Sequence, residues 1–383
     1  MAVMATGQSI SAGAAEPEAI EIVPAEFIGD RVFATPTTAD GTVLRFFTDT
    51  GGGWNAIAED VAERLGLERA DMANGSEQRF VEFPRFDGGK PIPRPPPYYA
   101  DGNLVVVARS EIGADGFLGG RWHADRVWEF DYLAKRLKLH PPSRAPTLGV
   151  AGVPLGFQTN SAGDRTMHFA RIEVSVAGES HDMLLDTGAT AHLADDAGRR
   201  FGLDTGTEIG TSFVTKSLFE QWAKSNPGWT VLERGDRIQG HTFPMIEVPR
   251  LTIGEHTVGP VWFVQRPDAW FGEYMAQMMD MPIDGAIGGS ALKYFRVVID
   301  YANATAYFTT SGTETAQYSQ GPLGRTGGRR GPVLYHAANA SGDAAEQLIP
   351  SSSRWLSPEL DASGHRSVEF QLSGSTWASL ATA

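Results

Sequence analysis

Leu184-Leu185-Asp186-Thr187-Gly188-Ala189 ends an apolar run in Asp-Thr-Gly, and Asp284-Gly285-Ala286-Ile287-Gly288-Gly289 follows further along the chain. The same two motifs occur earlier, in the same order, as Asp49-Thr50-Gly51 and Asp115-Gly116-Phe117-Leu118-Gly119-Gly120. A single Asp-Thr-Gly is a common turn sequence. Two copies, each opening a unit that closes in the same way, predict a duplicated β-lobe that brings two carboxylates together.

Matched segments surround both copies. Each Asp-Thr-Gly follows a strand–turn–strand pattern, with the turns at 39–41 and 177–179. Each is followed by a helical spacing that ends in Gly-Leu, over 54–67 and 192–203. After each Asp-Gly block a strand pattern ends in an acid–tyrosine pair, Asp131-Tyr132 or Asp300-Tyr301. The four matches predict an all-β protein with short helices, built as two β-barrel lobes with pseudo-two-fold symmetry.

The second copy, over 183–308, resembles the bacterial retropepsin-like aspartyl proteases. The shared order is strand, Asp-Thr-Gly-Ala, helix, long β-region, Asp-Gly block and a strand ending in Ile-Asp-Tyr. The first copy, over 31–139, follows this order more loosely. Two lobes in one chain resemble the pepsin-like layout, whereas retroviral-type relatives supply one lobe per chain and dimerise. The resemblance implies an acid protease fold and an aspartic-type peptidase, a hydrolase that uses neither metal nor cofactor.

A pair of close carboxylates can activate water without a metal. The two cannot both ionise easily, so one keeps a proton. The ionised carboxylate then takes a proton from the attacking water, and the protonated one polarises the substrate carbonyl. Asp49 and Asp186 are the predicted catalytic pair. Which of them is the base stays open, because the two titrate as a coupled pair.

The resemblance gives the neighbouring residues a role in supporting the catalytic loops. Thr50 and Thr187 would hydrogen-bond backbone groups across the lobe interface. Gly51 and Gly188 would approach the carboxylates closely and offer them N–H donors. The apolar triplets 117–119 and 286–288 would cross beneath the Asp loops. In pepsin-like enzymes a Ser or Thr follows Asp-Thr-Gly, whereas Gly and Ala stand at 52 and 189 here, so the first lobe departs from the pattern.

Three functions stay open on the sequence. The first is an aspartic endopeptidase that acts on a peptide or protein substrate, as a monomer if both lobes form the pair. The second is a non-catalytic peptide-binding protein that keeps the double lobe. The third is a protease that homodimerises through lobe 2 and leaves lobe 1 as an accessory. Serine and zinc hydrolases are excluded, because the chain has no G-x-S-x-G and no H-E-x-x-H.

Composition limits the partners. A net charge of −14 without a basic stripe argues against nucleic acid. No run approaches membrane-spanning length. The absence of cysteine excludes disulfides and thiolate chemistry. The first 15 residues make a poor signal peptide, so the location stays unknown, although a periplasmic or secreted one is compatible with the sequence.

The segments divide the chain as follows. We expect an N-terminal extension over 1–27, lobe 1 over 28–140, a linker and the start of lobe 2 over 141–165, lobe 2 over 166–311, and a disordered tail over 312–383. Asp115 and Asp284 are expected to fix turns, and Asp131 and Asp300 to be exposed strand ends. The patterns over 214–224 and 270–279 favour core helices. Tyr98 or Tyr99 is a candidate flap residue over the cleft.

Overall fold

The computed structural model describes residues 20–68, 70, 79–86, 91–97, 102–141 and 150–310, together with the short strands β25 (Ser367–Val368) and β26 (Ala381–Thr382). Tyr98 and Tyr99 lie outside the described residues, as do residues 1–19 and, apart from β25 and β26, the predicted tail.

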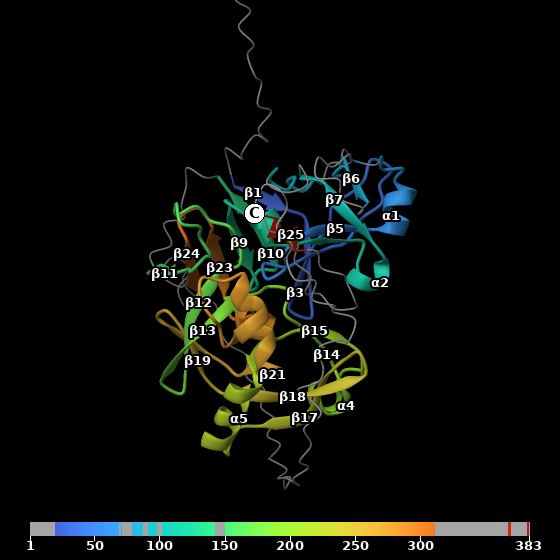
Figure 1. The fold of residues 1–383 in the computed structure, drawn as a ribbon. Coiled ribbons are helices and arrows are strands. Elements are labelled where there is room, and N and C mark those ends of the chain that lie inside the picture. The colour runs from blue at the N-terminus through green and yellow to red at the C-terminus, as the bar shows by residue number, and fades with distance from the viewer. Residues whose placement is uncertain are drawn as a thin grey trace, which may run out of the picture.

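Lobe 1 is built on a seven-stranded sheet of order β2-β3-β4-β8-β5-β7-β6, drawn in blue to teal in Figure 1. Three short helices accompany it. The strands are β2 (Ala25–Ile28), β3 (Arg31–Ala34), β4 (Phe46–Thr48), β5 (Asn55–Ala58), β6 (Phe80–Val81), β7 (Leu104–Val107) and β8 (Gly116–Leu118), and the helices are α1 (Glu59–Arg64), α2 (Arg109–Ile112) and α3 (Gly120–His123).

Lobe 2 is built on a nine-stranded sheet of order β17-β18-β21-β16-β22-β13-β12-β19-β20. Its strands are β12 (Arg171–Val176), β13 (Glu179–Leu185), β16 (Ser212–Thr215), β17 (Val231–Ile238), β18 (His241–Val248), β19 (Leu251–Ile253), β20 (His256–Val258), β21 (Val261–Arg266) and β22 (Gly285–Ile287). Its helical segments are α4 (Asp195–Phe201), α5 (Lys216–Ser225), η2 (Trp270–Tyr274), η3 (Met275–Gln277) and α6 (Gly289–Leu292), and a separate two-stranded ribbon joins β14 (Thr190–His192) to β15 (Glu208–Gly210).

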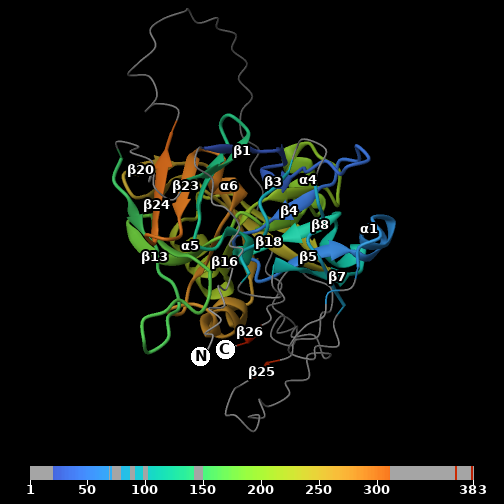
Figure 2. The ribbon, with the colours of Figure 1, turned by 90° about the horizontal axis from the view of Figure 1, so that it is seen from above.

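A six-stranded sheet of order β1-β10-β9-β23-β24-β11 joins the lobes and forms one side of the molecule in Figure 2. Its two central strands come from different lobes: β9 (Val127–Asp131) pairs antiparallel with β23 (Arg296–Asp300). Each continues into a hairpin within its own lobe, with β10 (Arg136–His140) or β24 (Thr305–Thr309). The outer strands are β1 (Glu21–Val23) and β11 (Val153–Pro154). The sheet therefore carries the pseudo-two-fold relation between the copies.

The strand pairings repeat from lobe to lobe. The strand that ends at each Asp-Thr-Gly runs parallel to the strand of the Asp-Gly block, as β4 with β8 and β13 with β22. A further strand lies antiparallel on the other side of that block, β5 in lobe 1 and β16 in lobe 2. These two also pair in parallel with β7 and β21. The predicted two-lobed acid protease fold is confirmed.

Local sequence explains why the lobes form. In β12, Ile172, Val174 and Val176 are buried while Glu173 between them is exposed, as period-two alternation requires. The β12–β13 turn has positive φ at Ala177 and Gly178, the geometry of a tight hairpin. The helical pattern over 214–224 is α5, which buries Leu218, Phe219 and Trp222. The pattern over 270–279 is also core, with Phe271, Met275, Met278 and Met279 buried.

Two expectations fail. The helical spacing over 54–67 is only half helix, because its first part is β5, which takes two sheet neighbours, and α1 starts at Glu59. Asp131 and Asp300 are buried rather than exposed. Each caps a turn: Asp131 accepts a hydrogen bond from Ala134 N, and Asp300 accepts two from Asn303.

Strands β1 and β2 fall mostly within 1–27, the expected N-terminal extension, and β11 falls within 141–165, the expected linker and start of lobe 2. β2 belongs to the seven-stranded sheet of lobe 1, and β1 and β11 are the outer strands of the six-stranded sheet that joins the lobes.

Candidate active site

Each motif Asp stands just beyond the end of a buried strand. Asp49 follows β4, and its backbone N–H donates to Leu118 O at 2.9 Å. Asp186 follows β13, and its N–H donates to Ile287 O at 2.9 Å. The apolar strands of the two Asp-Gly blocks therefore run directly beside the Asp loops. Asp49 is 4% exposed and Asp186 is fully buried.

The two loops approach each other so closely that only glycine fits beside each carboxylate. Gly51 N donates to Asp49 Oδ1, and Gly188 N to Asp186 Oδ1, each at 2.8 Å. A Cβ added at Gly51 would lie 2.6 Å from Cγ of Asp186, and one at Gly188 would lie closer still to Cγ of Asp49. Neither glycine has a positive φ, so close approach alone requires it. The two carboxyl groups consequently face the same small space.

Four hydrogen bonds between the two threonines and the facing backbone link the loops. Thr50 Oγ1 donates to Leu185 O at 2.7 Å and accepts from Thr187 N at 3.0 Å. Thr187 Oγ1 donates to Thr48 O at 3.4 Å and accepts from Thr50 N at 3.1 Å. Both threonines are buried. Each side chain thus uses its hydroxyl as donor and acceptor across the lobe interface, which fixes the register of one loop against the other.

Burial and mutual repulsion determine the pKa values of the two carboxyls. Burial raises the pKa of Asp49 well above its usual range, and the negative charge of Asp186 raises it further. Burial also raises the pKa of Asp186, although a hydrogen bond from Asp49 works in the opposite direction. Asp186 Oδ2 accepts no hydrogen bond from any N–H or O–H of the described residues. A proton on the pair would give this buried oxygen the donor that it lacks.

The residue after each Asp-Thr-Gly distinguishes the lobes. At Gly52 an added Cβ would lie 2.5 Å from the Phe117 ring and 3.1 Å from Asp49 Oδ2. The Phe117 ring, stacked on Trp54 with centroids 5.4 Å apart, therefore fills the place where a side chain at position 52 would stand. Ala189 in lobe 2 is buried and has only a methyl group there. Neither position offers a hydroxyl to the pair.

Sequence patterns missed one further matched pair. Asn55 Oδ1 accepts from Gly119 N at 3.0 Å, and Ser212 Oγ accepts from Gly288 N at 3.1 Å. Both residues open the strand beside an Asp-Gly block, β5 or β16. A polar residue at the head of an otherwise apolar strand is the signal that could have revealed them. Their bonds hold the glycine of each block beneath the carboxylates.

The other motif acids are structural. Asp115 Oδ2 accepts from Arg45 N at 2.8 Å, and its Oδ1 lies 3.0 Å from Arg109. Asp284 faces His181 at 3.4 Å, and its N–H donates to Asp182 O. Within the described ranges, no group of three or more acids and histidines is arranged to hold a metal ion. The helices of those ranges are also too short or too polar to span a membrane.

The likeness of this chain to known proteins lies among solved structures. No protein-family model and no curated protein matches the chain. Among solved structures it is similar to the aspartic proteinase from Irpex lacteus, with 12% sequence identity, 78% of this chain and 99% of that chain covered, and a TM-score of 0.40. A superposition this loose carries no argument, so the fold and the site rest on the strand pairings and contacts described above.

Proposed function

We propose that the protein is an aspartic endopeptidase in which Asp49 and Asp186 activate a water molecule for attack on a peptide bond. The observation that carries the proposal is the reciprocal contact of the two loops, with the glycine of each motif against the carboxyl group of the other. Two buried carboxyls that face one space and are linked by threonines suit shared-proton catalysis.

The proposed reaction needs one proton on the pair. The ionised carboxylate takes a proton from the water as its oxygen attacks the carbonyl carbon. The protonated carboxyl gives its proton to the carbonyl oxygen, which becomes a hydroxyl of the tetrahedral intermediate. As the intermediate collapses and the C–N bond breaks, the pair gives a proton to the leaving nitrogen and takes one back from a hydroxyl of the intermediate. The pair returns to its starting state with a single proton.

The raised pKa values set the expected pH dependence. Activity requires the singly protonated pair, so it falls as pH rises through the upper pKa of the pair. Because burial and repulsion raise that pKa, the fall lies above the usual range of an aspartic acid. Activity also falls at low pH, when both carboxyls are protonated and no base remains.

The test is cleavage of a casein-like substrate by the wild type and by Asp49→Asn and Asp186→Asn. Each amide keeps the shape of the carboxyl but can neither act as base nor share the proton. Both substitutions should lower kcat by at least about 10⁴-fold, the order seen when one member of a catalytic unit is removed. EDTA and serine-directed reagents should have no effect, whereas a statine-type peptide, which mimics the tetrahedral intermediate, should inhibit.

Two results would favour the other functions. Full activity of Asp49→Asn together with an inactive Asp186→Asn would indicate a lobe-2 homodimer with lobe 1 as an accessory. A wild type that binds statine-type peptides yet cleaves nothing at any pH would indicate a non-catalytic peptide-binding protein. In both lobes, however, the Asp has its Gly N–H donor and its Thr link across the interface, which favours the single-chain pair.

A further inference from the structure

A second link between the lobes lies apart from the threonines. Arg31 on β3 of lobe 1 is 2.5 Å from Glu208 on β15 of lobe 2. The other carboxylate oxygen of Glu208 lies 3.1 Å from Nε2 of His192 on β14. The Arg31 side chain is only 12% exposed, and its guanidinium also packs over the rings of Phe33 and Phe47. The three side chains therefore form a continuous ionic chain across the lobe interface.

The Arg31–Glu208–His192 ionic chain is linked to both carboxylates through a few intervening residues. On the lobe 1 side, the residue after Arg31 is Val32, whose carbonyl accepts from Thr48 Oγ1 at 2.9 Å, and Thr48 immediately precedes Asp49. On the lobe 2 side, β14 begins two residues after Gly188. Thr190 Oγ1 donates to Gly188 O at 2.8 Å. A shift of Arg31 relative to the β14–β15 ribbon would therefore displace both Asp loops.

Backbone contacts fix the same ribbon against lobe 1. Gly210 N donates to Gly29 O at 2.6 Å, in the β2–β3 turn. The carbonyl oxygen of Asp30, next in that turn, lies so near Gly210 that an added Cβ would be 2.5 Å away. Figure 1 shows β14 and β15 beside β3, in the angle between the lobes. Lobe 1 has no equivalent ribbon, since residues 52–54, which are all described, lead directly into β5.

We propose that Arg31, Glu208 and His192 are positioning residues that clamp the β14–β15 ribbon to lobe 1 and thereby hold the Asp186 loop against the Asp49 loop. The inference rests on the proposed function. It adds a second, one-sided clamp to the symmetric threonine link, and none of its three residues touches the reacting atoms.

The clamp should be strongest in mildly acidic solution. The charged groups that face His192 are Glu208 on β15, Asp236 on β17 and Arg31 on β3. Glu208 raises the pKa of His192, so the His192 contribution is complete below the ordinary histidine value of 6.5 and is lost as pH rises through the raised pKa. His192 and Arg31 together lower the pKa of Glu208 to about 2, so its contribution is complete above 4.5 and is lost as pH falls through that lowered value.

The test is a double-mutant cycle on kcat with Arg31→Met, Glu208→Gln and the double variant. Both single changes should lower kcat by about tenfold with little change in KM, because small misplacements of catalytic groups are costly. The double variant should lose no more than either single variant, since the two residues act as one unit. The two substitutions remove opposite charges, so an effect of charge alone would move the activity in opposite directions and would overturn the proposal.

Two further variants complete the design. For His192→Gln, the ratio of wild-type to variant kcat should fall towards one as pH rises through the His192 pKa, once the separately titrated pKa values of the pair in the two proteins are taken into account. Asp60→Asn is the matched control, because it removes an Arg109–Asp60 pair of 2.7 Å that lies wholly within lobe 1. It should leave kcat unchanged. A pH-independent ratio, or an equal loss in the control, would show that the clamp has no positioning role.

A carboxyl ¹³C NMR titration separates failure of the clamp from failure of the proposed function. Loosening the clamp weakens repulsion within the pair, so Arg31→Met and Glu208→Gln should both lower its upper pKa, by about half a unit. If the wild type cleaves no peptide, the function fails and this shift alone decides the clamp. If the wild type cleaves and the variants match it in both kcat and titration, the clamp fails and the function stands.

Discussion

Lobe 1 and lobe 2 hold their aspartates in the same way and differ in the chain that follows them. In both, a glycine N–H donates to the carboxylate, a threonine crosses to the other lobe and an apolar strand runs beneath. In lobe 1 the chain then enters β5 at once, whereas in lobe 2 it makes the β14–α4–β15 excursion before β16. The geometry of the pair thus depends on these three repeated contacts, which we call the repeated frame. The segments around the frame differ between the lobes.

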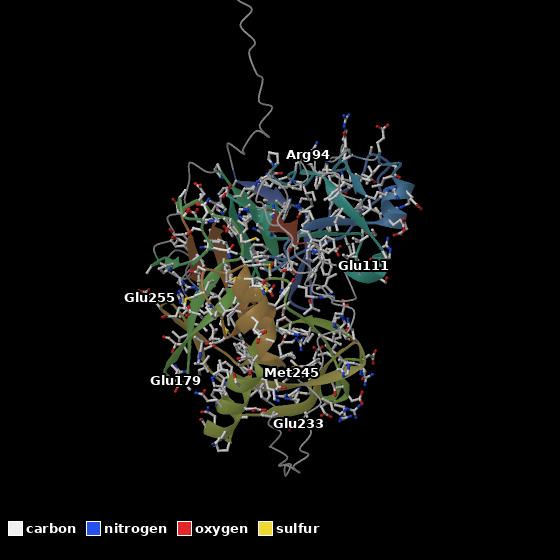
Figure 3. All side chains as sticks on the ribbon, viewed as in Figure 1. Arg94, Glu111, Glu179, Glu233, Met245 and Glu255 are labelled. Carbon is white, nitrogen blue, oxygen red and sulfur yellow. The ribbon has the colours of Figure 1, made fainter. Side chains whose placement is uncertain are left out.

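The difference extends to the outer surface of the lobes. Figure 3 labels Glu111, which lies in α2 of lobe 1, and Glu233, which lies in β17 of lobe 2. Lobe 2 has there a long hairpin of eight residues in each strand. In the corresponding part of lobe 1, the strand found within the described residues is the two-residue β6, paired with β7. The predictions below test whether the repeated frame, and not these additions, controls the activity.

After the aspartates themselves, the largest effect is expected from a methyl group added at Gly51 or Gly188. Gly188→Ala would place its Cβ against the Asp49 carboxyl, and Gly51→Ala against that of Asp186. Both should lower kcat by more than about 10²-fold, because an error of about 1 Å in a catalytic group is enough for such a loss. Gly228→Ala is the control, since an added Cβ there meets nothing within 4 Å. Equal activity of all three variants would refute the close approach.

The next effect distinguishes the lobes directly. Gly52→Ser must displace the Phe117 ring and should cost about 1–3 kcal/mol of stability, as overpacking does, along with activity. Ala189→Ser adds only a hydroxyl to a Cβ already present and should remain active, with a lowered upper pKa if the hydroxyl bonds the ionised carboxylate. Combining Gly52→Ser with Phe117→Leu should restore stability. Thermal unfolding and pH–rate profiles measure both effects, and identical behaviour of the two serine variants would contradict the asymmetry.

A smaller effect concerns the threonine link. Thr50→Val removes the shorter donor bond, 2.7 Å to Leu185 O, whereas Thr187→Val removes one of 3.4 Å. We expect Thr50→Val to lower the free energy of unfolding by about 1–3 kcal/mol, because it leaves buried groups unpaired, and Thr187→Val to lower it less. Chemical denaturation of the two single variants and the double variant measures these losses as a double-mutant cycle. Additive losses would mean that the two residues do not form one network.

The smallest effect is the pH dependence of stability from the pair. Its raised pKa values mean that the folded chain binds more protons than the unfolded one as pH rises above the ordinary value of 3.8. The free energy of unfolding should therefore fall with pH there, by at most about 1.4 kcal/mol per pH unit for each proton. Asp186→Asn should reduce this fall, because it removes one titrating group and its repulsion of Asp49, whereas the burial of Asp49 remains. Subtracting the variant from the wild type isolates this reduction from Glu129 and Glu208, whose lowered pKa values act in the opposite sense at lower pH.

Much of the fold could be predicted from repeated motifs, because turn chemistry and alternation are local. The strand patterns ending at Asp131-Tyr132 and Asp300-Tyr301 indicated β9 and β23, but not that these strands pair with each other. The spacing of Ile57, Val61 and Leu65 is compatible with one helix over the whole segment. It is equally compatible with a strand followed by a helix. Only the sheet neighbours of β5 decide between them. Burial of Asp300 likewise depends on Asn303 and on strands distant in the sequence.

At the site, the sequence indicated which residues meet but not how. Asp49, Thr50 and Gly51 and their counterparts could be named because the motif repeats. The Arg31–Glu208–His192 chain could not be predicted, since it joins β3 to a ribbon that has no copy in lobe 1. The role of Gly52 also required the structure, because the ring that excludes a side chain there belongs to Phe117, on another strand.

The most direct test of the central claim is the ¹³C NMR titration of the Asp49 and Asp186 carboxyls in the wild type and in Asp186→Asn. A pair within one chain predicts that both resonances follow the same two titration steps, the upper one above the usual aspartic acid range. Asp186→Asn should leave Asp49 with a single step at lower pH, because the repulsion from Asp186 is gone. Two independent single-step titrations, with Asp49 unchanged in the variant, would contradict the account.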